Sequence, residues 1–234
     1  MITVAILAGG LATRLRPITE TIPKALVEVA GKPFIVHQLG YLREQGISQV
    51  VLCVGYLGDM IRDVVGNGAS LGLKVSYSED GPNLLGTGGA LAKAIDLLGD
   101  HFFVLYGDSF LPLNFSVVQS AYEKSKLPSL MTVLKNQNQW DKSNVLFVDG
   151  QLLEYNKRAP RPEMTYIDYG LGVLSASVLE QYSAGQGFDL ADIYQDLSLK
   201  GRLAGLEVLE RFYEIGSHVG LKETEEYLLN KEKL

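Results

Sequence analysis

Two glycines and two basic residues near the N-terminus form the group most suited to chemistry. Gly9 and Gly10 end the apolar run of residues 3–8, and Arg14 and Lys24 follow. Glycines after a buried strand let backbone N–H groups approach a phosphate or a base edge. Arginine offers a fork of donors to phosphate oxygens, and lysine adds a mobile point charge. The spacing equally fits a strand-ending turn with two solvated basic residues, and it matches neither a Walker loop nor a Rossmann fingerprint.

A second glycine-rich segment, Gly86-Thr87-Gly88-Gly89, opens an expected helix. Glycines at a helix N-terminus can cradle an anion or let a flat ring lie against the backbone. The same residues would also allow close packing of the helix on its neighbours. Just upstream, the Glu79 carboxylate could accept hydrogen bonds from a bound ligand, or it could be a solvated turn residue.

A carboxylate, Asp108, follows the expected strand 102–106 after a single glycine. At the carboxyl end of a central strand, this carboxylate could hold Mg²⁺ against phosphate oxygens. A Gly-Asp pair is otherwise an ordinary turn.

These residues must be positioned by alternating strands and helices. The expected elements up to residue 110 are strands 3–8, 49–54, 73–78 and 102–106, and helices 33–46, 57–66 and 88–98. That alternation predicts parallel strands with crossover helices on both faces, and ligands at the carboxyl ends of the strands near a topological switch point. We therefore expect a Rossmann-like three-layer α/β/α fold with a mixed, mainly parallel sheet.

Beyond residue 110 the pattern loosens, and turn signals become more frequent. The expected elements are helices 116–126, 176–183, 189–199 and 220–231, and strands 129–135, 144–148, 151–155, 166–174, 203–209 and 211–215. We predict one domain over 1–234, with a nucleotide-binding half over about 1–110. The half over about 111–234 would bind the second substrate in a small lobe inserted beside the sheet.

Composition excludes several classes of protein. Hydrophobic residues at 47% and charged residues at 21% are globular values, and the net charge of −6 disfavours nucleic acid as a partner. The single cysteine, Cys53, permits no intramolecular disulfide and fits a reducing compartment. No signal peptide or membrane span is evident, so we expect a soluble, cytoplasmic protein with no membrane partner.

The segment 7–17, followed by Pro23-Lys24, resembles the N-terminal motif of the sugar-1-phosphate nucleotidyltransferases. In that family Gly-Gly-x-(Gly/Ala)-Thr-Arg-Leu precedes Pro-Lys, and Ala12 stands where many members have glycine. The resemblance runs from Ile2 to about Tyr227. It is strongest to short members such as the heptose-1-phosphate guanylyltransferases and N-acetylmuramate-1-phosphate uridylyltransferases.

The resemblance implies roles for particular residues. The implied nucleotide-binding residues are Leu7, Ala8, Gly9, Gly10, Glu79, Gly86, Thr87 and Gly88. The implied catalytic residues are Arg14, Lys24 and Asp108, with Asp108 and Glu214 as ligands of a Mg²⁺ cofactor. Lys157 and Asp168 would bind the sugar phosphate.

Several positions depart from the family pattern. Glu214 replaces a usual aspartate, so it could ligate the metal or be an exposed strand carboxylate. Asn156 replaces a usual glutamate, and Asp168-Tyr169 replaces Asn-Ala. Asp168 could therefore bond sugar hydroxyls, or it could cap a strand turn.

The implied activity is Mg²⁺-dependent transfer of a nucleoside monophosphate from an NTP to a sugar 1-phosphate, giving an NDP-sugar for cell-surface polysaccharide and releasing pyrophosphate. GTP is the favoured nucleotide, UTP is next, and CTP, used by the phosphocholine enzymes of this fold, is a distant third. The alternative is a catalytically silent relative that binds nucleotide sugars as a sensor or regulatory subunit. The expected protein partner is a second copy of the chain, in a homodimer.

Overall fold

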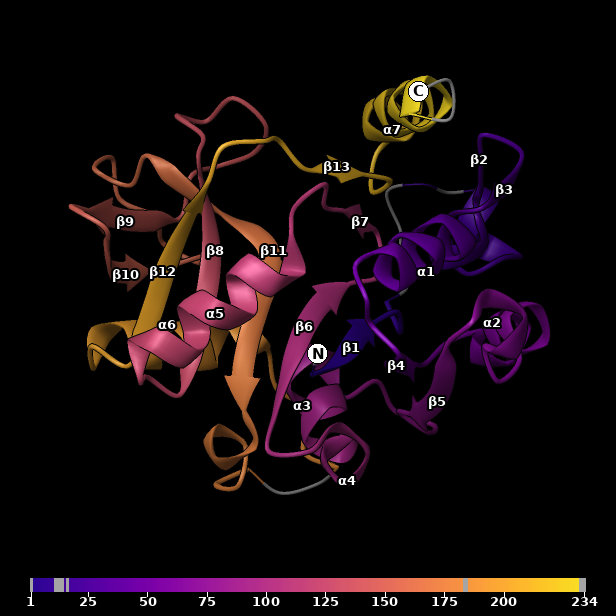
Figure 1. Cartoon of the computed structure of the whole chain (residues 1–234), viewed down its shortest axis with the longest axis horizontal. Coiled ribbons are helices and arrows are strands. Elements are labelled where there is room, and N and C mark those ends of the chain that lie inside the picture. Colours follow the sequence, from indigo (N-terminus) through magenta and orange to yellow (C-terminus); the bar gives the residue numbers. More distant parts are fainter. Residues whose placement is uncertain (1, 11–14, 16, 183–184, 232–234) are drawn as a thin grey trace.

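The computed structural model describes residues 2–10, 15, 17–182 and 185–231 (Figure 1). They form an α/β structure around one nine-stranded mixed sheet. The predicted catalytic residue Arg14 lies outside the described residues. In the part of the chain that is described, no helix is long and apolar enough to cross a membrane.

Four strands from the first half of the chain form the parallel part of the sheet. They are β1 (Thr3–Leu7), β4 (Gln49–Val54), β5 (Lys74–Glu79) and β6 (His101–Tyr106). Their order across the sheet is β6-β1-β4-β5, and every pair is parallel. Such strands are covered on both faces, which is why they read as nearly continuous apolar runs. The predicted parallel core is confirmed.

The second half of the chain continues the same sheet from β6. Strand β11 (Tyr166–Ser175) pairs antiparallel with β6 and also with β8 (Ser129–Lys135), and β12 (Leu203–Val208) pairs parallel with β8. A hairpin of β9 (Val145–Val148) and β10 (Gln151–Tyr155) joins β11 at the far edge. The sheet is therefore mixed, as predicted.

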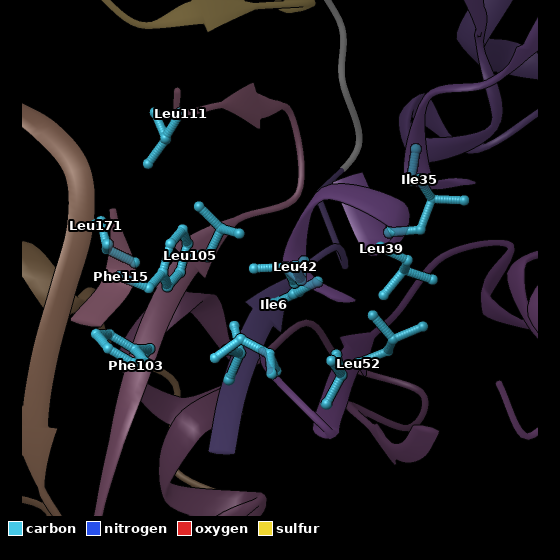
Figure 2. Packing of buried hydrophobic residues seen from close by; sticks show 14 of the residues in the cluster. Ile6, Ile35, Leu39, Leu42, Leu52, Phe103, Leu105, Leu111, Phe115 and Leu171 are labelled. Carbon is cyan, nitrogen blue, oxygen red and sulfur yellow. The ribbon is translucent and has the colours of Figure 1, made fainter. Parts of the chain in front are cut away.

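Helices cover both faces of this sheet, because side chains alternate along each strand. On one face, Val4 and Ile6 of β1 share a core with α1 (Phe34–Glu44), α2 (Gly58–Val65) and α5 (Phe115–Ser125). Figure 2 shows this core around Ile6.

On the other face, Ala5 of β1 shares a core with three further helices. They are α3 (Gly86–Lys93), α4 (Ile95–Leu98) and α6 (Leu190–Leu199). The three-layer arrangement that the alternation of elements predicts is confirmed.

A third, smaller core joins the C-terminal helix α7 (His218–Lys231) to the first half of the chain. It contains residues from or beside the two-residue strands β2 (Glu28–Val29), β7 (Ser109–Phe110) and β13 (Tyr213–Glu214). Strand β3 (Lys32–Pro33) pairs with β2. Short 3-10 helices cover Ile18–Glu20, Lys24–Leu26, Ala69–Leu71 and Ala176–Val178.

Three predicted elements differ from the structure. The helix expected over 88–98 is divided into α3 and α4, because the Ala94 N–H bonds to both Ala90 O and Leu91 O and ends the first helix there. The strand expected over 211–215 shrinks to β13. The helix expected over 176–183 is only the 3-10 turn Ala176–Val178, since its few apolar residues supply a single buried turn.

Candidate active site

The site begins where β1 and β6 end side by side. The chain runs from β1 outward to β4 and β5 and returns on the other side of β1 as β6, which makes this the switch point of the parallel sheet. Leu7 lies opposite Tyr106, and the Gly107 N–H donates to Leu7 O at 3.0 Å. A Cβ on Gly107 would lie 2.8 Å from that oxygen, so only glycine lets Asp108 leave the sheet this close to β1.

Lys24 and Asp108 meet at this edge. The Lys24 ammonium donates to Asp108 Oδ2 at 2.8 Å, and both side chains are partly exposed, at 17% and 29%. Lys24 opens the 3-10 turn that follows the extended Pro23, which directs it back toward the sheet. The Ser109 hydroxyl lies 3.3 Å from Asp108 Oδ1. Residues far apart in the sequence thus place a positive and a negative charge together at the switch point.

A cavity of about 260 Å³ opens beside this ion pair. Its lining includes eight of the predicted site residues: Leu7, Ala8, Gly9, Gly10, Lys24, Gly86, Thr87 and Asp108. The other predicted residues in the described part of the chain, Glu79, Gly88, Lys157, Asp168 and Glu214, do not line it. The structure therefore brings together both glycine segments, a lysine and a carboxylate.

The carboxylate that faces this cavity from β5 belongs to Asp80, not to Glu79. Asp80 lines the cavity and is 9% exposed, whereas the exposed Glu79 side chain pairs with Arg62. The Leu85 N–H donates to Asp80 Oδ2 at 3.2 Å, and burial raises the pKa of Asp80. The signal for Asp80 is strand alternation, because the neighbouring inward side chain of β5 is the buried Ser78.

The glycines of α3 make close contact with the chain just before α6. The N–H groups of Gly88 and Gly89 both approach Phe188 O, at 3.0 and 3.3 Å. A Cβ on Gly88 would lie 2.3 Å from the Phe188 ring. Gly88 therefore serves packing in this structure, while Gly86 and Thr87 face the cavity.

Thr87 links the cavity to a second group of polar residues. Its hydroxyl donates to Asp189 Oδ1 at 2.7 Å and accepts the Leu190 N–H at 2.8 Å. Burial alone would raise the pKa of Asp189, but hydrogen bonds from Ala191 N–H and Thr87, with the charge of Lys157, hold it below its ordinary value. Asp189, which no sequence motif marks, is therefore a fixed negative charge behind the cavity wall.

Asp168 and Lys157 belong to the same group of charged residues as Asp189. The charge of Lys157 acts on both carboxylates, and both carboxylates act on Tyr106, which lines the cavity. Burial raises the pKa of Asp168 to about 6, although a hydrogen bond from Gly170 N–H at 2.9 Å and the Lys157 charge lower it. One oxygen of Asp168 thus caps the strand turn, which is the structural alternative that the sequence left open.

Glu214 lies in β13 opposite Ser109, and the following Ile215 N–H donates to Asp108 O at 2.9 Å. The Glu214 carboxylate accepts the Ser217 hydroxyl at 2.8 Å and the Gly216 N–H, both at the start of α7. Carboxylates are favourable there, because the N-terminal N–H groups of a helix lack partners. Glu214 is therefore held beside the segment that carries Asp108.

A magnesium ion fits this part of the site. Asp108 offers carboxylate oxygens, the ligands that Mg²⁺ prefers, and the Lys24 ammonium shows that a cation is accommodated against it. Glu214 lies opposite Ser109 outside the cavity lining, and both its oxygens already accept hydrogen bonds near α7. Among the described residues, no three His, Cys, Asp or Glu side chains are grouped to hold a metal by themselves. The ion would then share its coordination with substrate phosphates and water, as Mg²⁺ commonly does.

Comparisons with known proteins show what the chain is similar to. Residues 3–142 match the family model described as nucleotidyl transferase. The chain is 30% identical over 227 residues to N-acetylmuramate alpha-1-phosphate uridylyltransferase of Neisseria meningitidis serogroup B, covering 94% of this chain and 95% of the relative. It is 28% identical to D-glycero-alpha-D-manno-heptose 1-phosphate guanylyltransferase of Campylobacter jejuni, covering 90% and 93%.

Among solved structures, HddC from Yersinia pseudotuberculosis in complex with GMP-PN superposes with a TM-score of 0.80 at 25% identity. The match covers 97% of this chain and all of that one. The matched family segment contains Lys24, Asp80 and Asp108, the charged residues that line the cavity. The chain therefore belongs to the nucleotidyl transferase family and is an enzyme of the sugar-1-phosphate nucleotidyltransferase type.

Proposed function

We propose that this enzyme transfers GMP from GTP to a sugar 1-phosphate, producing a GDP-sugar and pyrophosphate. The observation that carries the proposal is the Lys24–Asp108 pair beside a cavity lined by both glycine segments. That geometry supports a nucleotide in the cavity, with its phosphates directed toward the ion pair.

The reaction needs no covalent intermediate, because the sugar phosphate is already an anionic nucleophile. One of its oxygens attacks the α-phosphorus of the nucleotide in line, and the pyrophosphate oxygen leaves from the opposite side. The difficulty is to hold two polyanions together, so positioning and charge neutralisation supply most of the catalysis. We assign that work to Lys24 at the reacting phosphates and to Lys157 on the sugar phosphate.

Arg14, outside the described residues, keeps its predicted role on the triphosphate. Bound Mg²⁺, held by Asp108 and Glu214, would neutralise charge on the nucleotide phosphates. With Mg²⁺ bound, the Lys24 ammonium would donate to the substrate phosphates in place of Asp108 Oδ2. The distance of 2.8 Å between Lys24 and Asp108 places the lysine where this exchange needs only a side-chain movement.

The choice of guanine is supported by Asp80. A carboxylate has two acceptor oxygens, and guanine presents an N1–H and an amino group side by side, whereas uracil presents a single N3–H. The buried Asp80 lies in the cavity wall, and we assign to its carboxylate the two guanine donors. The Campylobacter guanylyltransferase and the GMP-PN complex of HddC point the same way, and the Neisseria uridylyltransferase supports UTP as the alternative.

The test is pyrophosphate release with Mg²⁺, crossing the four ribonucleoside triphosphates with mannose, glucose, N-acetylglucosamine, N-acetylmuramate and heptose 1-phosphates. Release with GTP above the other nucleotides supports the proposal, and release with UTP alone replaces guanine by uracil. If no combination releases pyrophosphate but NDP-sugars still raise the melting temperature, the result favours a regulatory nucleotide-sugar sensor.

A matched pair of variants tests the site within the same assay. Asp108→Asn keeps the size of the side chain but removes the charge, and we expect turnover to fall by about 100-fold or more. Asp96→Asn makes the same change at an exposed position of α4 and should leave turnover unchanged. Turnover near wild type in Asp108→Asn, with normal folding by circular dichroism, would remove Asp108 from the mechanism.

A further inference from the structure

A group of charged and phenolic residues surrounds Tyr106. We call it the sugar-side cluster, and it consists of Lys157, Asp168, Asp189, Tyr106, Tyr155 and Tyr194. Tyr106 connects it to the cavity, because this residue lines the cavity and feels the charges of both carboxylates. Thr87, which also lines the cavity, donates directly to Asp189.

The cluster holds two carboxylates against a single ammonium group. Asp189 is fixed in its ionised form by the Ala191 N–H and the Thr87 hydroxyl. Asp168 accepts the Gly170 N–H with Oδ1, and within the described residues no other hydrogen bond reaches its carboxylate. Arg158, the next basic residue, pairs with Asp192 at 2.7 Å on the exposed side of α6, and its charge acts on Asp189 less than that of Lys157 does.

The balance of charge changes when substrate binds. In the proposed function Lys157 binds the phosphate of the sugar phosphate, so its positive charge is shared with that phosphate. Asp168 then has no cation to offset its charge, and Asp189 keeps only the weaker effect of Arg158. Free carboxylate oxygens accept hydrogen bonds from hydroxyl or amino groups, but they repel another carboxylate.

We propose that the sugar-side cluster makes this enzyme selective for sugar 1-phosphates that carry no carboxylate group. The inference rests on the proposed function and narrows its second substrate. It separates the chain from its Neisseria relative, which is named for N-acetylmuramate, a sugar with a lactyl carboxylate. It agrees with the mannose- and heptose-phosphate relatives, whose sugars are neutral.

The test compares sugars that differ in one carboxylate. N-acetylglucosamine and N-acetylmuramate 1-phosphates differ only by the lactyl ether, and mannose and mannuronate 1-phosphates differ only at C6. We expect kcat/KM to favour the neutral member of a pair by about tenfold or more at low salt, because the carboxylates of the cluster repel a carboxylate on the sugar. Added NaCl should reduce the preference, since salt screens it.

Two variants assign the preference to the cluster. Asp168→Asn keeps the oxygen that accepts the Gly170 N–H and removes the charge, so we expect the ratio to fall at least about threefold through better use of the acidic sugar. Asp196→Asn removes an exposed carboxylate of α6 that pairs with Lys200, and the ratio should stay at the wild-type value. Equal use of both sugars by the wild type, or an unchanged ratio in both Asp168→Asn and Asp189→Asn, overturns the inference.

Failure of the proposed function gives a different result. If no sugar phosphate releases pyrophosphate, the reaction is wrong, and the inference is then decided by competition binding of GDP-mannose against GDP-mannuronate. Tighter binding of the neutral ligand, reduced in Asp168→Asn, supports the inference without turnover. Equal affinities, or tighter binding of the acidic ligand, overturn it.

Discussion

Asp168 shows how one side chain can be suited to binding at a cost to folding. Its carboxylate is buried beside Lys157, and burial outweighs the lysine in setting its pKa to about 6. At neutral pH the group is mostly ionised, which the proposed contacts with sugar hydroxyls require. A carboxylate that is ionised against the effect of burial lowers the stability of the folded protein.

The stability effect has a definite sign and pH range. Because the folded pKa of about 6 lies above the ordinary pKa of 3.8, the folded state keeps a proton that the unfolded state has lost between these values. We therefore expect the free energy of unfolding of the wild type to fall, relative to Asp168→Asn, as pH rises from 4 to 6. The difference should reach about 3 kcal/mol at most and stay level above that range.

Urea unfolding of both proteins at intervals between pH 4 and pH 8 measures this difference. Asp196→Asn serves as the control, because its carboxylate is exposed and its curve should run parallel to that of the wild type. A gap between wild type and Asp168→Asn that does not change with pH would contradict the raised pKa.

The sequence predicted the cavity residues near the ends of β1 and β6 more accurately than the other residues of the site. Gly9, Gly10, Lys24 and Asp108 were predicted, and the structure places all of them around one cavity. The carboxylate expected at Glu79 is provided by its neighbour Asp80, since a shift of one residue along a strand reverses the direction of the side chain. Asp189 had no local signal, because its importance depends on Thr87, from a distant part of the chain.

At the scale of elements, α3 is positioned by contacts that local sequence does not reveal. The sequence indicates a helix after Gly86, and both an anion cradle and close packing fitted its glycines. The structure shows the packing partner, the backbone and ring of Phe188 just before α6. This contact joins the cavity wall at Thr87 to the helix that follows Asp189, so the nucleotide side and the sugar side share one support.

Substituting alanine at two helical glycines tests this support. At Gly88 a new Cβ would lie 2.3 Å from the Phe188 ring, so Gly88→Ala should lower the free energy of unfolding by about 1–3 kcal/mol. At Gly40, in α1, nothing lies within 4 Å of the added Cβ, and Gly40→Ala should stabilise by about 0.5–1 kcal/mol. Thermal and urea unfolding of both variants provide the measurement.

The two variants are also expected to differ in activity. Movement of Phe188 displaces Asp189 and Thr87, so Gly88→Ala should raise the KM for the sugar phosphate more than Gly40→Ala does. Equal stability of Gly88→Ala and wild type would show that the segment before α6 moves without cost. That result would contradict the role assigned to the contact between Gly88 and Phe188.

At the scale of the whole molecule, the two halves of the chain share their cores. Strand β11 from the second half pairs along β6 from the first, and Leu171 lies in the same apolar cluster as Ile6 (Figure 2). The C-terminal helix α7 packs through Leu228 against Val27 and Phe34 near the start of the chain. The sequence indicated a division of roles near residue 110, but it could not show these pairings, because they join segments far apart in the chain.

Shared cores predict that both halves unfold together, and the chain carries a reporter in each. Cys53 is the single cysteine and lies in the first half, 1% exposed, where burial raises its pKa to about 12 and suppresses its reactivity. Trp140 is the single tryptophan and lies in the second half, where the Arg211 guanidinium stacks 3.7 Å from its ring. We expect the urea midpoint for thiol labelling of Cys53 to coincide with that for Trp140 fluorescence, because neither half can expose its core without opening the β6–β11 pairing.

Leu105→Ala, which removes a shared core side chain on β6, should lower both midpoints together, since it creates a cavity in the common cluster. Labelling of Cys53 at urea concentrations where Trp140 fluorescence is still native would instead show that the nucleotide half opens by itself, and the predicted single domain over 1–234 would then be two.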